Sequence, residues 1–246
     1  MEEQQRLPEP VKFTSYLTKR EIICALIWLP VHLFVLPVAA GMLLQNGTVN
    51  EAQANLLIYG ISSVYILLAE FTFLRREFDP FCDRKLYCVM QVLSHYLVMM
   101  AMNLFVSGII SGAETLFGNG GVIDNLNNDA IIELAGKDMN VISAMTIFLA
   151  PIVEEVIFRG GIFCALRKTS RTAAYVISIL LFSVYHIWSY AIYDPSYWIY
   201  ILQYLPAGFL LCRCYERTNS IWCSIFFHML TNDIALTALT ALSQKF

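Results

Sequence analysis

Long apolar runs separated by short polar loops are the dominant pattern of this 246-residue chain. A helix needs about 20 mostly apolar residues to cross the hydrocarbon core of a membrane. Seven runs reach this length, at residues 22–44, 54–74, 86–110, 141–166, 172–192, 196–215 and 219–242. The alternating pattern of a transmembrane barrel is absent from the sequence. The pattern therefore predicts an all-α, polytopic membrane helix bundle with about seven transmembrane helices.

The composition excludes two broad classes of protein. Hydrophobic residues make up 58% of the chain and charged residues 14%, whereas about a quarter of the residues in a soluble domain are charged. No single core of a domain this size buries such an excess, so the protein is not expected to be a soluble enzyme. The formal net charge of −3 offers no basic face for nucleic acid. The lipid bilayer is the expected environment.

The basic residues predict which way the bundle faces. Lysine and arginine concentrate in cytoplasmic loops, and here they fill the N-terminal segment and every second loop. They are Arg6, Lys12, Lys19, Arg20, Arg75, Arg76, Arg84, Lys85, Arg167, Lys168, Arg171, Arg213 and Arg217. The opposite loops and the C-terminal segment hold Lys137 and Lys245. We expect a multi-pass protein with a cytoplasmic N-terminus.

This topology divides the chain into three parts. Residues 1–21 are expected to form a cytoplasmic tail. Residues 22–140 are expected to form three peripheral transmembrane helices and an outward loop, and residues 141–246 a four-helix catalytic core. The division follows from the chemistry of the later runs, which carry the unusual polar residues described next.

The fourth run carries a cluster of charges that lipid should not tolerate. Charge at the centre of a bilayer costs several kcal/mol, so an ionisable residue there is a functional candidate. Glu155 and Arg159 stand at i and i+4, the spacing of an ion pair on one helix face. Glu154 is rotated by about 100° from Glu155 and lacks a cation of its own. The alternative is a structural ion pair beside one protonated glutamate.

The same run contains residues that disturb a regular helix. Pro151 removes a backbone donor three residues before Glu154, which favours a local break in the hydrogen-bond ladder. Gly160 and Gly161 follow Arg159, and glycine allows helices to approach closely. We therefore expect an irregular helix around the charges.

Two later runs place polar side chains at a similar depth. The fifth contains His186, and the seventh contains His228 and Asn232 on one helix face. With a rise of about 1.5 Å per residue, Glu154 lies ~18 Å, His186 ~21 Å and His228 ~14 Å from the cytoplasmic ends of their runs. Scattered structural polar residues need not share a level. The spacing predicts a common site in the membrane.

Other polar residues in the runs have weaker functional signals. His32 and His95 have no partner at helical spacing, so packing or a hydrogen bond between helices is expected. Glu70 lies close to Arg76 and is expected to extend toward the cytoplasmic surface. Asp233 follows Asn232 and is expected either at the edge of the same site or held protonated.

Together the polar residues form three short motifs. They read E-E-x-x-x-R, F-x-x-x-H and H-x-x-x-N, on Glu154, Glu155, Arg159, Phe182, His186, His228 and Asn232. In this order the motifs resemble the signature of the CAAX protease and bacteriocin-processing family of intramembrane proteases, also called the Abi family, which includes the Ras-converting enzyme. The resemblance covers residues 145–235, and no signature position departs from it.

The resemblance implies an intramembrane endopeptidase of a bacterial cell membrane, with a site that opens toward the cytoplasmic side. In the family pattern Glu154 and His186 activate a water molecule, while His228 and Asn232 bind the oxyanion. Glu155 pairs with Arg159 to support the site, together with the motif residue Phe182 (not counted among the reacting groups). Prenylated peptides, leader peptides, bacteriocin-type peptides and anchored regulatory proteins are all compatible membrane-associated substrates.

A metal is the open question of the chemistry. Glu154, His186 and His228 have the composition of a zinc site with an open position. However, the metalloprotease motif H-E-x-x-H is absent, and using Glu154 as a ligand would require another base, Glu155 or Asp233. We therefore favour a glutamate mechanism without metal or other cofactor, with zinc as the alternative.

Three other functions use the same residues. A proton-coupled transporter would employ Glu154, His186 and His228 as a relay, although no internal repeat is visible in the sequence. A zinc amidase acting on lipids would need a third histidine ligand, which neither His32 nor His95 is spaced to provide. A non-catalytic immunity or binding protein would keep the site without turnover.

Overall fold

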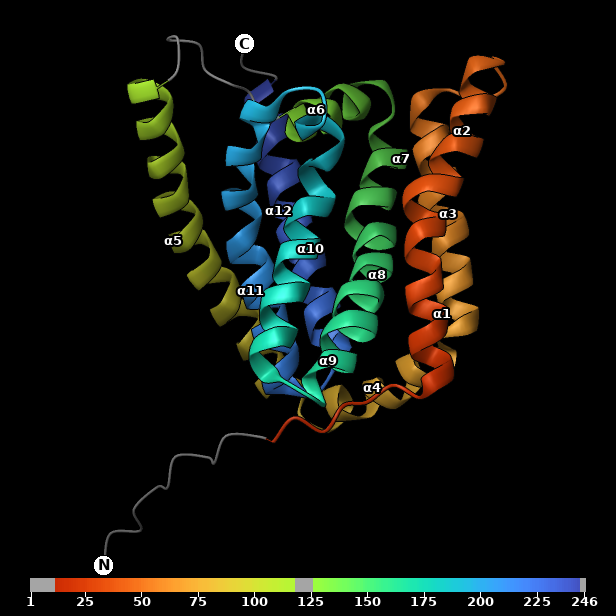
Figure 1. The fold of residues 1–246 in the computed structure, drawn as a ribbon, viewed down its shortest axis with the longest axis vertical. Helices are drawn as coiled ribbons and strands as arrows, with labels where there is room; N and C mark the ends of the chain where they lie inside the picture. Colours follow the sequence, from red (N-terminus) through yellow and green to blue (C-terminus); the bar gives the residue numbers. More distant parts are fainter. Residues whose placement is uncertain (1–11, 118–125, 244–246) are drawn as a thin grey trace, which may run out of the picture.

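The computed structural model describes residues 12–117 and 126–243, and within them every regular element is a helix (Figure 1). The elements are α1 (Lys19–Pro30), η1 (Val31–Val35), α2 (Leu36–Gln45), α3 (Glu51–Ala69), α4 (Phe71–Asp83), α5 (Lys85–Phe117), α6 (Leu126–Lys137), α7 (Met139–Ser143), η2 (Ala144–Leu149), α8 (Ala150–Glu155), η3 (Val156–Cys164), α9 (Ala165–Arg167), α10 (Arg171–Ala191), η4 (Pro195–Tyr200), α11 (Ile201–Thr218) and α12 (Ile221–Ser243). The prediction of an all-α, polytopic membrane bundle is confirmed.

Five helical segments of the described chain are long and apolar enough to cross a membrane. They are Lys19–Gln45, Glu51–Ala69, Lys85–Ala113, Met139–Arg167 and Arg171–Ala191, which correspond to the first five predicted runs. The helices α11 and α12 stand in the same bundle (Figure 1) but carry more polar residues. The number of spans, the cytoplasmic N-terminus and the division into three parts stay predictions.

The second predicted run ends earlier than the apolar pattern indicates. The helix α3 stops at Ala69, and α4 crosses the end of the bundle instead of continuing it (Figure 1). Glu70, at the corner between them, is fully buried, and neither of its carboxylate oxygens has a hydrogen-bond partner among the described residues. The expectation that Glu70 extends to the surface is therefore wrong, because the corner turns its side chain inward.

Three stretches of π-helix interrupt the long helices, and two of them precede a proline by one turn. In η1 the N–H of Leu36 donates to the carbonyl of Val31, and in η2 the N–H of Ala150 donates to Met145. The next residues, Pro37 and Pro151, have no N–H to return to the regular pattern. The wider turns accommodate these missing donors, and π-turns are frequent at functional sites.

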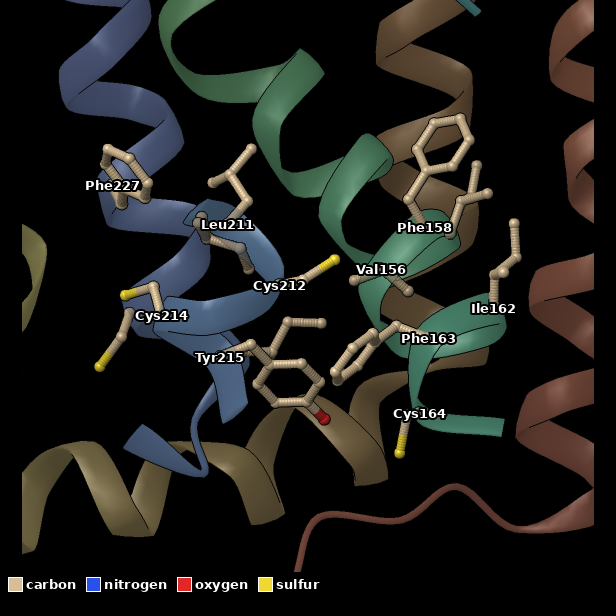
Figure 2. Close-up of a cluster of buried hydrophobic side chains, with 14 of the residues drawn as sticks. Val156, Phe158, Ile162, Phe163, Cys164, Leu211, Cys212, Cys214, Tyr215 and Phe227 are labelled. Atoms are coloured by element: carbon tan, nitrogen blue, oxygen red, sulfur yellow. The ribbon is translucent and has the colours of Figure 1, made fainter. Parts of the chain in front are cut away.

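The largest apolar core lies where η3 packs against α11 and α12. Figure 2 shows side chains of this core, among them Val156, Phe163, Cys212, Cys214 and Tyr215, and all five have no exposed surface. The aromatic rings of Phe163 and Tyr215 both contact Phe13, from the segment before α1. This dry layer closes the end of the bundle that holds α4 and α9.

Gly161 sets the distance between α1 and η3. A Cβ atom at this position would lie 2.9 Å from the Cβ of Ala25, which is closer than two carbons can pack. The expected close approach of helices at Gly161 is therefore confirmed. It keeps the fourth run, with its charged residues, firmly against the first.

We predict that Gly161→Ala lowers the free energy of unfolding by about 1–3 kcal/mol, the usual cost of overpacking. The reason is the forced separation of α1 from η3. Thermal unfolding in detergent measures it, and a double-mutant cycle with Ala25→Gly should recover part of the loss. Gly60→Ala is the matched control, because its Cβ would meet nothing within 4 Å. Equal effects of Gly161→Ala and Gly60→Ala would contradict the contact.

Candidate active site

The structure brings three of the predicted site residues to one point. Glu154 lies at the end of α8, His186 on α10 and His228 on α12. The Oε2 atom of Glu154 is 3.6 Å from Nε2 of His186 and 3.8 Å from Nε2 of His228. This oxygen is buried and has no direct hydrogen-bond partner among the described residues. Glu154, His186 and His228, which the sequence placed at a similar depth, therefore lie close together in the structure.

The neighbouring Glu155 is held by a dense network. Its Oε1 atom is 3.0 Å from Nη1 of Arg159 and 2.9 Å from Nδ1 of His228, and its Oε2 accepts a hydrogen bond from Ser224. Glu155, Arg159 and Ser224 are all fully buried. Burial of an isolated carboxylate is costly unless it is paired and hydrogen-bonded, and these partners meet that requirement. Both oxygens of Glu155 therefore have partners, whereas Oε2 of Glu154 has no hydrogen-bond partner among the described residues.

The backbone and Glu155 define how the two imidazoles face Glu154. The Nδ1 atom of His186 is 2.8 Å from the carbonyl oxygen of Phe182, which can only accept, so Nδ1 carries the proton. The Nδ1 atom of His228 donates to the Glu155 carboxylate in the same way. In the neutral rings, Nε2 is then the lone-pair nitrogen. Both lone pairs are on the atoms nearest Glu154.

Phe182 supports the site through its ring. The guanidinium carbon of Arg159 lies 4.1 Å from the centroid of this ring, within range of a cation–π interaction. The ring also packs against His186, with centroids 4.5 Å apart, and Tyr204 stacks on His186 at the same separation. Phe182 and Tyr204 thus fix the plane of the His186 imidazole.

Asn232 lines the same cavity as the other three candidates, but its amide is engaged elsewhere. Its Nδ2 atom donates to the carbonyl oxygen of Thr146 in η2, at 2.9 Å. An amide carries two N–H donors, so this contact uses one of them. Asp233, on the next position of α12, is exposed and does not line the cavity, so its expected place at the edge of the site is wrong.

The four candidates share a cavity of about 870 Å³. Most of its wall is apolar or aromatic, as is usual for a binding pocket. Glu154, His186 and His228 lie at one end, and the lining continues along the bundle to residues of α6. The cavity can hold several residues of an extended peptide beside the polar cluster.

A hydrogen-bonded chain that the motifs do not contain leads to Glu154. The hydroxyl of Tyr59 is 3.4 Å from Oε1 of Glu154 and 2.8 Å from the hydroxyl of Tyr185. Tyr185 contacts Nε2 of His32 at 3.0 Å, and Nδ1 of His32 is 2.8 Å from Ser62. The expected hydrogen bond of His32 between helices is confirmed. No spacing in the sequence connects Tyr59 with Glu154.

His95 makes a local contact rather than one between helices. Its Nδ1 atom is 2.7 Å from the carbonyl oxygen of Gln91, one turn earlier on α5. The ring packs near Phe227, which agrees with the expected packing role.

Among the described residues, the side chains that could bind a metal are not arranged as a metal site. Within residues 12–117 and 126–243, no group of three or more histidine, cysteine, aspartate or glutamate side chains has an arrangement that could hold a metal ion. Glu154, His186 and His228 therefore do not form a fitted zinc site, and we derive no step through a metal. A mechanism without metal stays a prediction.

Comparison with known proteins supports the resemblance read from the motifs. Residues 138–234 match the Rce1-like family model, described as type II CAAX prenyl endopeptidase Rce1-like. The chain is also 34% identical over 137 residues to a Bacillus subtilis (strain 168) protein named "Putative membrane peptidase YdiL". That match covers 54% of this chain and 50% of the relative, so the chain spans half the relative's length. No solved structure matches the chain significantly. Residues 138–234, which match the Rce1-like family model, carry all three motifs.

Proposed function

We propose that the protein is an intramembrane endopeptidase that hydrolyses a peptide bond of a membrane-associated peptide. The observation that carries the proposal is the Oε2 atom of Glu154, which is buried and faced by the Nε2 atoms of His186 and His228. The family match and the membrane peptidase relative support the same class of reaction. A cavity of about 870 Å³ beside these groups provides room for the peptide.

Glu154 and His186 are the groups proposed to activate water. Their closest atoms are 3.6 Å apart, which is longer than a good hydrogen bond and suits a bridge through one water molecule. The Glu154 carboxylate accepts a proton from this water while the lone pair of His186 orients it. The water oxygen then forms a bond to the carbonyl carbon of the substrate, and the carbonyl electron pair moves onto oxygen.

His228 and Asn232 are the groups proposed to stabilise the resulting oxyanion. Because Nδ1 of His228 donates to Glu155, its Nε2 atom can donate only when the ring carries both protons. The Glu155 carboxylate stabilises that charged ring, which in turn opposes the developing negative charge. Asn232 contributes a neutral amide donor that does not titrate.

Collapse of the intermediate completes the reaction. The carbonyl forms again, the C–N bond breaks, and the proton held by Glu154 passes to the leaving nitrogen. Glu154 thus acts first as a general base and then as a general acid, which is the ordinary sequence for one positioned carboxyl group. Water has been added across the peptide bond, and the side chains return to their starting state.

The transporter alternative makes a different demand on the bundle. A relay through Glu154, His186 and His228 would need access from both ends. Val156, Phe163 and Tyr215, in the part of the fold that follows Glu155 along η3 and in α11, belong to a fully buried apolar core (Figure 2). This packing favours a site with one entrance, as a hydrolase needs. A non-catalytic immunity protein would share the geometry and differ in turnover, which the first experiment below measures.

We predict that Glu154→Gln lowers the cleavage rate of a membrane-anchored peptide by about 10²–10⁴-fold, the usual contribution of a general base. The amide keeps the size of the side chain but cannot accept the proton from water. A panel of prenylated, leader and bacteriocin-type peptides in proteoliposomes provides the assay. Asp233→Asn is the matched control, because this exposed acid lies on α12 outside the cavity.

Two results would oppose the proposal. Full turnover by the Glu154→Gln variant would remove Glu154 as the base. No cleavage of any peptide by the unaltered protein, although it is folded by size-exclusion chromatography, would favour the non-catalytic alternative.

We also predict that a strong chelator leaves the cleavage rate unchanged, because no step of the proposed reaction uses a metal. The same proteoliposome assay, with and without chelator, measures this. Loss of cleavage that zinc restores would overturn the metal-free mechanism and return Glu154 to the role of a ligand.

Tyr59 is predicted to position Glu154 rather than to react. Tyr59→Phe removes the hydroxyl between Glu154 and Tyr185, and we expect kcat to fall by about 3–10-fold, in keeping with a net hydrogen bond of about 1 kcal/mol. KM should change less than kcat, because the ring of Tyr59 stays in the cavity wall. Tyr193→Phe is the control, since Tyr193 is 90% exposed. A change in KM alone would indicate a substrate contact instead.

A further inference from the structure

We propose that His32 is a positioning residue for the Glu154 carboxylate, so that the site extends beyond the residues that match the family model. His32 acts through two tyrosines, Tyr185 and Tyr59. It lies in η1 and Tyr59 lies in α3, both before residue 138, where the family match begins. This role of His32 rests on the proposed function, because Glu154 is the general base there. The hydrogen-bonded chain itself does not depend on the reaction.

The two carboxylate oxygens of Glu154 have different surroundings. Oε2 faces the two histidines of the motifs, at 3.6 Å from His186 and 3.8 Å from His228. Oε1 accepts a hydrogen bond from the hydroxyl of Tyr59, at 3.4 Å. This distance is at the long end for a hydrogen bond between oxygens, and catalytic contacts often shorten when substrate binds. Tyr59 therefore holds the carboxylate by the oxygen that does not face the proposed water.

Each hydroxyl of the chain has one hydrogen, and this determines the direction of every bond. An ionised carboxylate only accepts, so Tyr59 donates its hydrogen to Glu154. In the contact of 2.8 Å between the two tyrosine hydroxyls, Tyr185 must then be the donor. Because the hydrogen of Tyr185 is used in this bond, the Nε2 atom of His32, at 3.0 Å, must donate to Tyr185. All of these bonds point toward Glu154.

His32 has a matching partner on its other nitrogen. The Nδ1 atom is 2.8 Å from the hydroxyl of Ser62 in α3. In a neutral imidazole with its proton on Nε2, Nδ1 is an acceptor, so the Ser62 hydroxyl donates to it. His32 is 4% exposed and Ser62 has no exposed surface, which shields the pair from bulk water. Ser62 thereby stabilises the tautomer of His32 that donates toward Glu154.

This tautomer distinguishes His32 from the other three histidines of the chain. In His95, His186 and His228, Nδ1 faces a carbonyl or carboxylate oxygen, which only accepts. Those three rings therefore carry a proton on Nδ1. In His32 both nitrogens face hydroxyl groups, so the direction of the chain decides which nitrogen carries the proton. The tautomer of His32 is thus a direct readout of the chain.

Ring packing and the α10 helix hold the chain in place. The ring of His32 packs edge to face against the ring of Tyr59, with centroids 5.1 Å apart. Tyr185 immediately precedes His186 on α10, so one helix provides a group for the chain and a group that faces Oε2 of Glu154. Hydrogen bonds in a row polarise one another. A change at His32 should therefore alter the environment of Glu154 although the two do not touch.

We expect His32→Leu to lower kcat by about 3–10-fold, the loss of one net hydrogen bond, with a smaller change in KM. The probe is whichever prenylated, leader or bacteriocin-type peptide the unaltered protein cleaves fastest in proteoliposomes. His32→Gln should restore most of kcat, because its amide N–H replaces the Nε2 donor. His95→Leu is the matched control and should keep kcat. His95 is 5% exposed, bonds a carbonyl of its own helix and is not in the described cavity wall.

A double-mutant cycle separates positioning from a loss of packing. Tyr59→Phe already removes the donor to Glu154, so adding His32→Leu should leave the total loss of kcat at about 3–10-fold. Independent effects would multiply, to about 10–100-fold. Such a product, or equal losses in His32→Leu and His95→Leu, would overturn the proposal. Because His32 is part of the cavity wall, a rise in KM alone would make it a substrate contact and would also overturn the proposal.

Tyr185→Phe breaks the chain without replacing His32, and it covers the case in which His32→Leu does not fold. The ring stays, while the hydroxyl between His32 and Tyr59 is removed. We expect kcat to fall by about 3–10-fold here too, with thermal unfolding in detergent as the check on folding. Unchanged kcat in a folded Tyr185→Phe protein would exclude the chain as the route to Glu154.

Nitrogen-15 NMR of histidine-labelled protein in lipid bilayers tests the chain without turnover. The signals of His32 are those that disappear in the His32→Gln variant. We expect a proton on Nε2 and none on Nδ1 of His32, whereas Nδ1 is protonated in the other three rings. A proton on Nδ1 of His32 with none on Nε2 would mean that the chain does not point toward Glu154, and the proposal would be wrong.

The two proposals can fail separately. The expected tautomer without cleavage of any peptide would remove the proposed function and keep the chain. Cleavage with full kcat in a folded His32→Leu protein would keep the endopeptidase and remove the role of His32.

Discussion

The buried ion pair between Glu155 and Arg159 is the constraint on which the site depends. Both side chains have no exposed surface, so neither charge can be screened by water. The network with Ser224 and His228 satisfies Glu155 and orients one imidazole at the same time. Because the arginine lies beside Glu155, the adjacent Glu154 keeps an oxygen that has no direct hydrogen-bond partner among the described residues and faces two histidines. Two carboxylates that are neighbours in the sequence thereby acquire different chemical environments.

Irregular helices make this arrangement compatible with a membrane. The stretches η1 and η2 contribute residues to the wall of the cavity, and η3 begins directly after Glu155. The first two accommodate prolines that lack a backbone donor. These stretches also position polar groups. His32 in η1 contacts Tyr185, and the carbonyl oxygen of Thr146 in η2 accepts a hydrogen bond from Asn232. A straight helix in each place would direct these groups elsewhere.

The two ends of the bundle differ in packing as well as in charge. Toward α4 and α9, an apolar layer without exposed surface separates the cluster from the basic loops. Toward α6, the cavity lining continues along α12 and α11. Placing reactive groups at the closed end of a cavity limits their contact with bulk water and strengthens electrostatic interactions there.

Much of the candidate site could be predicted from the sequence. The periodicity of a helix and the depth of a residue along its apolar run depend only on the local sequence. The apolar runs predicted the helices, and the i, i+4 spacing of Glu155 and Arg159 predicted their ion pair. The similar depths of Glu154, His186 and His228 predicted that they meet. These inferences needed only the rise and rotation of a helix and the thickness of a bilayer.

The remaining features depend on how separate helices pack. Tyr59 reaches Glu154 from α3, Glu70 turns inward at the α3–α4 corner, and Asp233 points away from the cavity. The cavity could not be predicted from the sequence either. An apolar residue gives the same sequence pattern whether it faces lipid, a packed core or a cavity. Sequence periodicity shows which residues share a face of one helix, whereas only tertiary packing decides what that face meets.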